Sequence, residues 1–285
     1  MGMRGYFYEK SGTERSFYTD LAAERRRADV ECEGVEYEKK ITLIGTWERV
    51  RITSEEGEIS VMRPIGTYDT LTTERLDELS EAELDDAAEE IAKRLCLICD
   101  EIGVFPARIL VAGFGNEALT PDSVGPKSAK RVKPTLHISE NDAEFFDEMD
   151  CSEIAVFCPG VAANSGMDSS ENLRMLSERL TPDLIIAIDS IMTSSKERLG
   201  ATFQISSTGL FPGGLGNLHS PVTRSTMGSP VIAIGVPTVI DCRHIAKEDF
   251  NGDSLFVSPR EIDLITDNAA FVIGGAINQA FGIDL

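Results

Sequence analysis

The stretch that most constrains the fold of this 285-residue chain runs from Arg108 to Lys133. Residues 109–112 form an apolar run typical of a buried strand, and the sequence GFGN ends it. Thr120, Pro121 and Asp122 then predict a helix start, with Thr as N-cap and an acid in the first turn. We therefore expect Asp122 at the carboxyl end of a sheet strand, where open α/β sheets usually hold their functional residues.

A second acid has a matching position. The apolar run from Leu184 to Ile188 predicts another buried strand, and Asp189 comes directly after it. If the two strands are parallel neighbours, Asp122 and Asp189 face one crevice, where like charges push their pKa values apart. Each acid also has a purely structural interpretation, Asp122 as a stabiliser of a helix dipole and Asp189 as a strand-end cap.

The rest of the chain alternates apolar strand patterns with helical ones. The clearest helix begins after Ser80, which forms a capping box with Glu83. The alternation predicts an α/β fold in which a mostly parallel sheet is sandwiched by helices. The predicted strands are 108–113, 154–158, 184–189, 202–206 and 231–235, and the predicted helices are 80–103, 121–131, 168–180 and 259–281.

The N-terminal part has a different pattern. Residues 47–52 and 58–62 alternate apolar and polar side chains around a turn at 54–57, which predicts a β-hairpin. We expect residues 21–75 to form a β-rich segment that flanks an α/β catalytic domain at 76–285.

Charge and composition exclude several classes of function. The formal net charge of -21 disfavours direct binding to nucleic acid or anionic membranes. No apolar run is long enough to span a membrane, and the N-terminus has no secretory h-region, so we expect a cytoplasmic protein. The six scattered cysteines suit reduced thiols, and no GxSxG elbow accompanies the three histidines. No metal or cofactor is expected.

Several longer motifs make a family resemblance specific. They keep one order and spacing, cover most of residues 108–241, and are joined by YTDLAAE near the N-terminus. The motifs are GFGNEALTPDSVGPK, PGVAANSGMDSSE, PDLIIAIDS, ATFQISSTGLFPGGLGN and GSPVIAIGVPTVID. Together they resemble the spore germination protease family, and the resemblance implies a fold similar to that of hydrogenase maturation proteases.

The resemblance also implies an activity. Members are endopeptidases of the spore core that degrade small acid-soluble spore proteins during germination, and the resemblance implies a homotetramer. Cleavage occurs after an acidic residue and before a hydrophobic residue and Ala. The two acids assigned as catalytic in the family fall on Asp122 and Asp189. Family members are made as zymogens, and Asp20-Leu21-Ala22 fits the substrate pattern, so we expect a propeptide of residues 1–20, cut between Asp20 and Leu21.

An acidic residue before the cut requires a cation in the site. The candidates are Lys127, Lys196, Arg198 and Arg224, of which Arg198 is favoured because the family shares its Glu-Arg dipeptide. Glycine-rich loops at Gly160 and Gly213 either offer backbone N–H groups to a substrate or are simply tight turns.

The two aspartates are expected to activate water by general acid–base catalysis. The helix N-terminus should lower the pKa of Asp122, which makes Asp122 the base and Asp189 the acid. Two departures from the family are a short connector at 242–258 and LHSP at 218–221 in place of a basic cluster. The alternatives are a hydrogenase-maturation-type endopeptidase and a catalytically degenerate binding homologue, although both aspartates are present.

Overall fold

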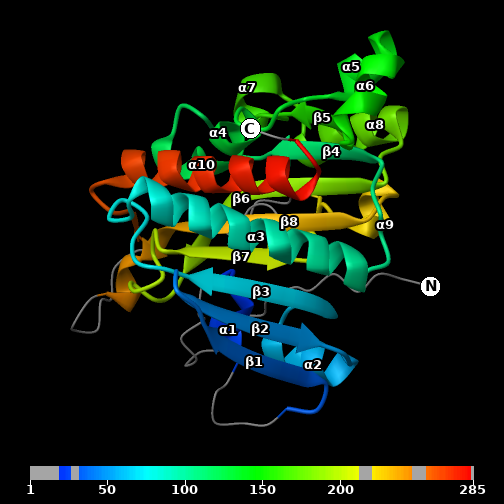
Figure 1. Cartoon of the computed structure of the whole chain (residues 1–285). Coiled ribbons are helices and arrows are strands. Elements are labelled where there is room, and N and C mark those ends of the chain that lie inside the picture. Colours follow the sequence, from blue (N-terminus) through cyan, green and yellow to red (C-terminus); the bar gives the residue numbers. More distant parts are fainter. Residues whose placement is uncertain (1–18, 27–31, 212–219, 246–254, 284–285) are drawn as a thin grey trace.

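A single sheet of nine strands organises the chain, and helices cover both of its faces (Figure 1). The computed structural model describes residues 19–26, 32–211, 220–245 and 255–283. The strand order is β1-β2-β3-β7-β8-β6-β4-β5, and β9 pairs with β8. The strands are β1 (Val35–Ile41), β2 (Thr46–Ile52), β3 (Gly66–Thr72), β4 (Arg108–Gly113), β5 (Glu153–Phe157), β6 (Leu184–Thr193), β7 (Thr202–Ser206), β8 (Val231–Asp241) and β9 (Phe256–Val257).

The two longest helices, α3 and α10, pack together on one face of the sheet, and α8 and α9 lie on the other (Figure 1). Within the described ranges, no helix combines the length and apolar character that crossing a membrane requires. The α-helices are α1 (Ala22–Arg25), α2 (Glu55–Val61), α3 (Glu81–Glu101), α4 (Val124–Ala129), α5 (Leu136–Asn141), α6 (Ala143–Met149), α7 (Ala162–Ser165), α8 (Ser169–Leu180), α9 (Arg224–Met227) and α10 (Ile262–Ala280), and the 3₁₀ turns are η1 (Thr120–Asp122) and η2 (Cys242–His244).

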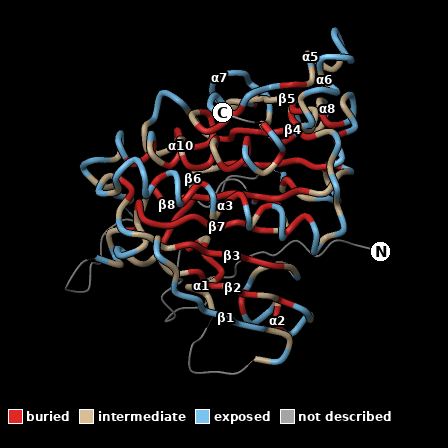
Figure 2. The backbone as a smooth tube through the Cα atoms, in the orientation of Figure 1, coloured by how far each residue is buried: buried red, intermediate tan, exposed pale blue. Residues whose placement is uncertain are grey.

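The α/β part of the sheet is parallel. Strands β5, β4, β6 and β8 are parallel neighbours, and most of their residues are buried (Figure 2). The predicted α/β fold with helices on both faces is therefore confirmed. The capping box of α3 is also present, since Ser80 and Glu83 bond reciprocally. Strands β6 and β8 continue beyond their predicted ends, to Thr193 and Asp241.

Alternation along β6 determines which face carries the second acid. Ile186 and Ile188 pack in the core beneath α3 and α10, whereas Ile185 and Ala187 pack beneath α8 and α9. Because successive side chains on a strand point to opposite faces, Asp189 lies on the face that α8 covers.

The N-terminal strands extend the same sheet instead of forming a separate appendage, because β3 pairs antiparallel with β7. The predicted second arm of the hairpin, at 58–62, is wrong: these residues belong largely to helix α2. Ser54 caps this helix by accepting a hydrogen bond from the Gly57 N–H, and three acids lie in its first turn. The hairpin that forms joins β1 and β2.

A short N-terminal segment crosses the sheet on the face opposite α3. Ala22, in α1, packs with Val50, Ile52 and Tyr68 in a small third core, behind β2 and β3 in Figure 1. Most of the predicted propeptide lies outside the described residues, but Asp20 and Leu21 lie within them. Both Leu21 and Ala22 are fully buried.

Candidate active site

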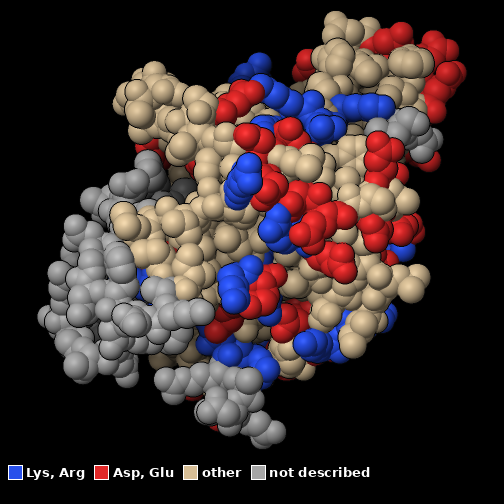
Figure 3. All heavy atoms as spheres, turned by 90° about the vertical axis from the view of Figure 1, so that its left-hand side faces the viewer, with Lys and Arg blue, Asp and Glu red and all other residues tan. Residues whose placement is uncertain are grey.

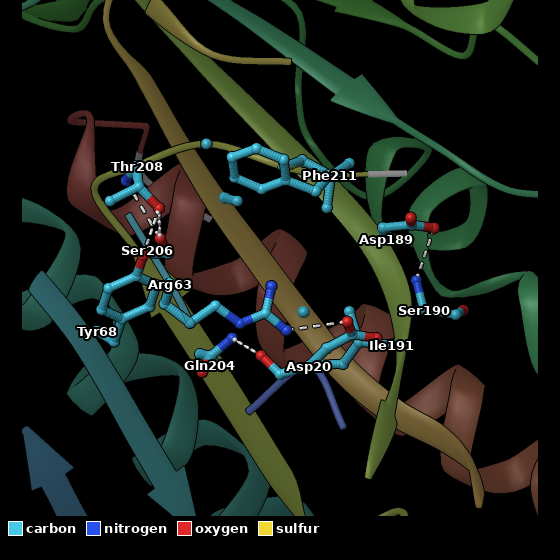
Figure 4. Close-up of a pocket in the computed structure, with 14 residues that line it drawn as sticks. Asp20, Arg63, Tyr68, Asp189, Ser190, Ile191, Gln204, Ser206, Thr208 and Phe211 are labelled. Atoms are coloured by element: carbon cyan, nitrogen blue, oxygen red, sulfur yellow. Dashed lines mark hydrogen bonds and ion pairs between the residues drawn. The ribbon is translucent and has the colours of Figure 1, made fainter. Parts of the chain in front are cut away.

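A pocket lies over β6, β7 and β8 on the face that carries Asp189 (Figure 4). Small residues of the strands, among them Ala233 and Gly235, leave the hollow in the sheet face. The free space is about 60 Å³, enough for a few water molecules. Among the residues that line it are Asp20, Arg63, Asp189, Gln204, Thr208 and Phe211.

Asp189 is the titratable group most affected by this environment. Its side chain is partly buried, and its Oδ1 accepts a hydrogen bond of 2.9 Å from the Ser190 N–H. Burial raises the pKa of Asp189 well above its usual range, and the negative charge of Asp122 raises it further. Asp189 is therefore the acid that holds a proton most firmly in this site.

Asp122 ends the 3₁₀ turn η1, and its Oδ2 accepts a hydrogen bond of 2.8 Å from the Asn116 N–H. The α-helix predicted to start here begins instead at Val124. Burial raises the pKa of Asp122, and the Asn116 hydrogen bond opposes this. The expected lowering by a helix N-terminus is therefore wrong, because Asp122 precedes the α-helix and is partly desolvated.

The backbone explains how the two acids come together. Strands β4 and β6 are parallel neighbours, and the Phe114 N–H donates a hydrogen bond of 2.8 Å to the Ile188 carbonyl just beyond the ladder. Asp122 comes after β4, and Asp189 follows Ile188 within β6, so both acids lie near the carboxyl end of β4. Asp122 is close enough for its charge to raise the pKa of Asp189, but it is not among the residues that line the pocket.

The other predicted substrate residues lie away from the pocket. Lys127 pairs with Asp267 at 2.8 Å and bonds Thr266, so it faces α10. Arg198 pairs with Glu48 and lies 3.8 Å from Glu24.

Of the two predicted glycine loops, Gly160 lies after edge strand β5, with φ +70°, and does not line the pocket. Gly213 lies outside the described residues.

Two pocket residues were not identified from the sequence. Arg63 lies after α2, a segment whose sequence pattern had suggested a hairpin, and Gln204 lies within β7. The period-2 pattern of β7 is the one available signal, since the buried Phe203 and Ile205 face α3 and place Gln204 on the opposite face.

Known proteins resemble this chain over most of its length. The germination protease family model matches residues 14–251. A germination protease of Caldanaerobacter subterraneus subsp. tengcongensis is 35% identical, covering 92% of this chain and 93% of its own. This chain belongs to the germination protease family. The resemblance inferred from the motifs is therefore confirmed.

Other germination proteases match over a similar extent. The relative from Clostridium perfringens (strain 13 / Type A) is 30% identical, covering 92% of this chain and 94% of its own. A solved nickel–iron hydrogenase maturation protease from Thermococcus kodakarensis KOD1 aligns with 64% of this chain and 96% of its own, at 19% identity and a TM-score of 0.37. A likeness this weak adds nothing to the assignment, which rests on the germination proteases.

Asp189→Asn is expected to stabilise the folded chain at neutral pH. Burial raises the pKa of Asp189 in the folded state, whereas in the unfolded chain it is about 4. Between these pKa values the folded state binds more protons, so the wild-type free energy of unfolding falls as pH rises. The variant lacks this titration, so its advantage should be absent in acid and grow toward neutral pH. Urea unfolding across that range measures it.

The matched control is Asp86→Asn, which changes an exposed aspartate on α3. Its free energy of unfolding should not rise relative to that of the wild type as pH rises. Equal pH dependence of Asp189→Asn and the wild type would contradict a raised pKa at Asp189.

Proposed function

We propose that this chain is an endopeptidase that degrades small acid-soluble spore proteins during germination, cutting after Glu or Asp. It is made as a zymogen that removes its own residues 1–20. One observation carries the proposal: Asp20, the residue before the predicted cut, lines the same pocket as Asp189. The chain thus holds a sequence of the substrate pattern, acid then Leu then Ala, at the acid that its family uses for catalysis.

The proposed mechanism divides the work between the two acids. Asp122, whose pKa is the less strongly raised, is ionised and takes a proton from the attacking water. Asp189 is protonated and gives its proton to the scissile carbonyl oxygen. When the tetrahedral intermediate collapses, that proton returns to Asp189, and Asp122 passes the proton that it took from water to the leaving amine. Asp122 as base and Asp189 as acid are the roles expected from the sequence, but the physical cause of this assignment is the stronger desolvation of Asp189.

The surface around the strand ends suits a protein substrate. The carboxyl ends of the parallel strands point toward the face seen in Figure 3, where the described Lys and Arg residues lie among Asp and Glu and form no extended basic area. Such a surface gives little electrostatic attraction to nucleic acid. The spore core as location and a homotetramer as assembly belong to the same proposal.

The test uses the purified full-length chain and a small acid-soluble spore protein. The two are incubated before and after acid treatment, and both are followed by mass spectrometry. We expect substrate cleavage after Glu or Asp together with loss of residues 1–20. An intact substrate with an intact N-terminus would favour the degenerate binding homologue instead.

A further inference from the structure

The carboxylate of Asp20 has a donor for each of its oxygens. Arg63 donates from Nη2 to Oδ1 at 3.0 Å (Figure 4). The Met192 N–H donates to Oδ2 at 3.0 Å. Asp20 also donates its own N–H to the Met192 carbonyl at 2.9 Å. A side chain that lacks a negative charge or the second oxygen would leave one of these donors without its partner.

The peptide on either side of the predicted cut is held by one side chain. Gln204 donates from Nε2 to the Asp20 carbonyl at 3.2 Å, and its Oε1 accepts from the Ala22 N–H at 2.8 Å. This orientation of the amide is required, because a carbonyl only accepts and an N–H only donates. Gln204 therefore spans the Asp20–Leu21 bond and fixes its position in the pocket.

The described hydrogen-bond partners of Arg63 belong to the segment that the zymogen would lose. Its side chain is only 14% exposed, and it contacts the Asp20 carboxylate and the Thr19 carbonyl. Its Nε is buried and finds no hydrogen-bond partner in the part of the chain that the structure describes. Removing residues 1–20 takes away both contacts and leaves the guanidinium facing the pocket without them. Arg198, by contrast, keeps Glu48.

We propose that Arg63 and the Met192 N–H form the subsite that recognises the acidic residue before the cut, and that Gln204 aligns the peptide across it. This inference rests on the proposed function, because it takes Asp20 as the residue before the cut. The same subsite receives the Glu or Asp of a protein substrate after processing. The unused Nε offers a second donor to the longer Glu side chain.

The test is a double-mutant cycle on self-processing of the full-length chain, followed by mass spectrometry. Arg63→Gln and Asp20→Asn should each slow cleavage between Asp20 and Leu21 by about 10- to 100-fold, since each breaks a charge-assisted contact. The double variant should be no slower than the slower single variant. A purely structural role of Arg63 would instead make the two effects multiply.

Arg198→Gln is the matched control, because it removes a guanidinium of similar burial near the same segment. In the Arg198→Gln variant, Asp20→Asn should slow cleavage between Asp20 and Leu21 as much as it does in the wild type. If Arg63→Gln fails to fold, Arg63→Lys takes its place, because it retains the charge but loses the planar guanidinium. In that variant, the slowing of self-processing by Asp20→Asn should be smaller than in the wild type by roughly threefold or more.

Two negative results are distinguishable. A wild-type chain that neither processes itself nor cuts after acidic residues overturns the proposed function and this inference together. Normal wild-type processing, with an undiminished Asp20→Asn effect in the Arg63 variants, overturns the role of Arg63 alone.

Discussion

Asp122→Asn and Asp189→Asn are each expected to lower kcat/KM for cleavage after Glu by at least about 10³-fold, and to prevent self-processing. Asn at position 122 accepts no proton from water, and Asn at position 189 donates none to the scissile carbonyl. Because the two groups act as one unit, the double variant should be little worse than either single variant. Cleavage of a purified small acid-soluble spore protein, followed by mass spectrometry, measures all three.

Asp86→Asn serves as the control for the loss of one carboxylate, and circular dichroism checks that each variant is folded. Asp189→Asn is the more informative variant, because it should be inactive while gaining stability at neutral pH. Retention of a tenth or more of wild-type activity by either single variant would contradict the two-acid mechanism.

Gly125→Ala is expected to lower the free energy of unfolding by about 3 kcal/mol or more. A Cβ at this position would lie 2.1 Å from the Phe114 carbonyl oxygen and 2.5 Å from the Ile188 carbonyl oxygen. Both are backbone atoms, one just after β4 and one within β6, so neither can rotate away. Relief of the clash requires the turn before Asp122 or the strand before Asp189 to move. Urea unfolding measures the loss of stability, and processing should slow with it.

Gly275→Ala in α10 is the matched control. Its Cβ would meet only the Ala88 Cβ, at an ordinary 3.5 Å. Ala also favours a helix over Gly, so this variant should be neutral or more stable by up to about 1 kcal/mol. An equal loss in the two variants would show that the close backbone approach at Gly125 has no special cost.

Much of the α/β part could be predicted because its local signals agree with its packing. The buried strands β4 and β6 each contain a continuous apolar run, at 109–112 and 184–188, and α3 has both a capping box and an apolar face. The positions of Asp122 and Asp189 could be inferred from parallel neighbouring strands, a relation that the alternation of elements already implied. The apolar runs, the capping box and the helix face depend on residues close together in the chain.

The errors concern features that depend on distant residues. The alternation at 58–62 suits a strand, but the Ser54 cap and the packing of Val61 against the N-terminal sheet favour α2. The pairing of Lys127 with Asp267 in α10, about 140 positions later, has no local signal either. Arg63 lies in no recognisable motif. Its partner Asp20 comes close to it only when the sheet folds, so no local pattern indicates the pair.

Leu21 and Ala22 are completely buried, so a cut before Leu21 would create new chain ends inside the protein. Hydrolysis turns a neutral peptide bond into a carboxylate and an ammonium group, in a place with little access to water. Burying such charges without full compensation is unfavourable, so the product is held less well than the intact chain was. If the proposed cut occurs, the cleaved N-terminal segment would therefore leave its site more readily than the intact one. Each molecule would then be activated once and irreversibly, and its pocket would be free to bind a protein substrate only after that cut.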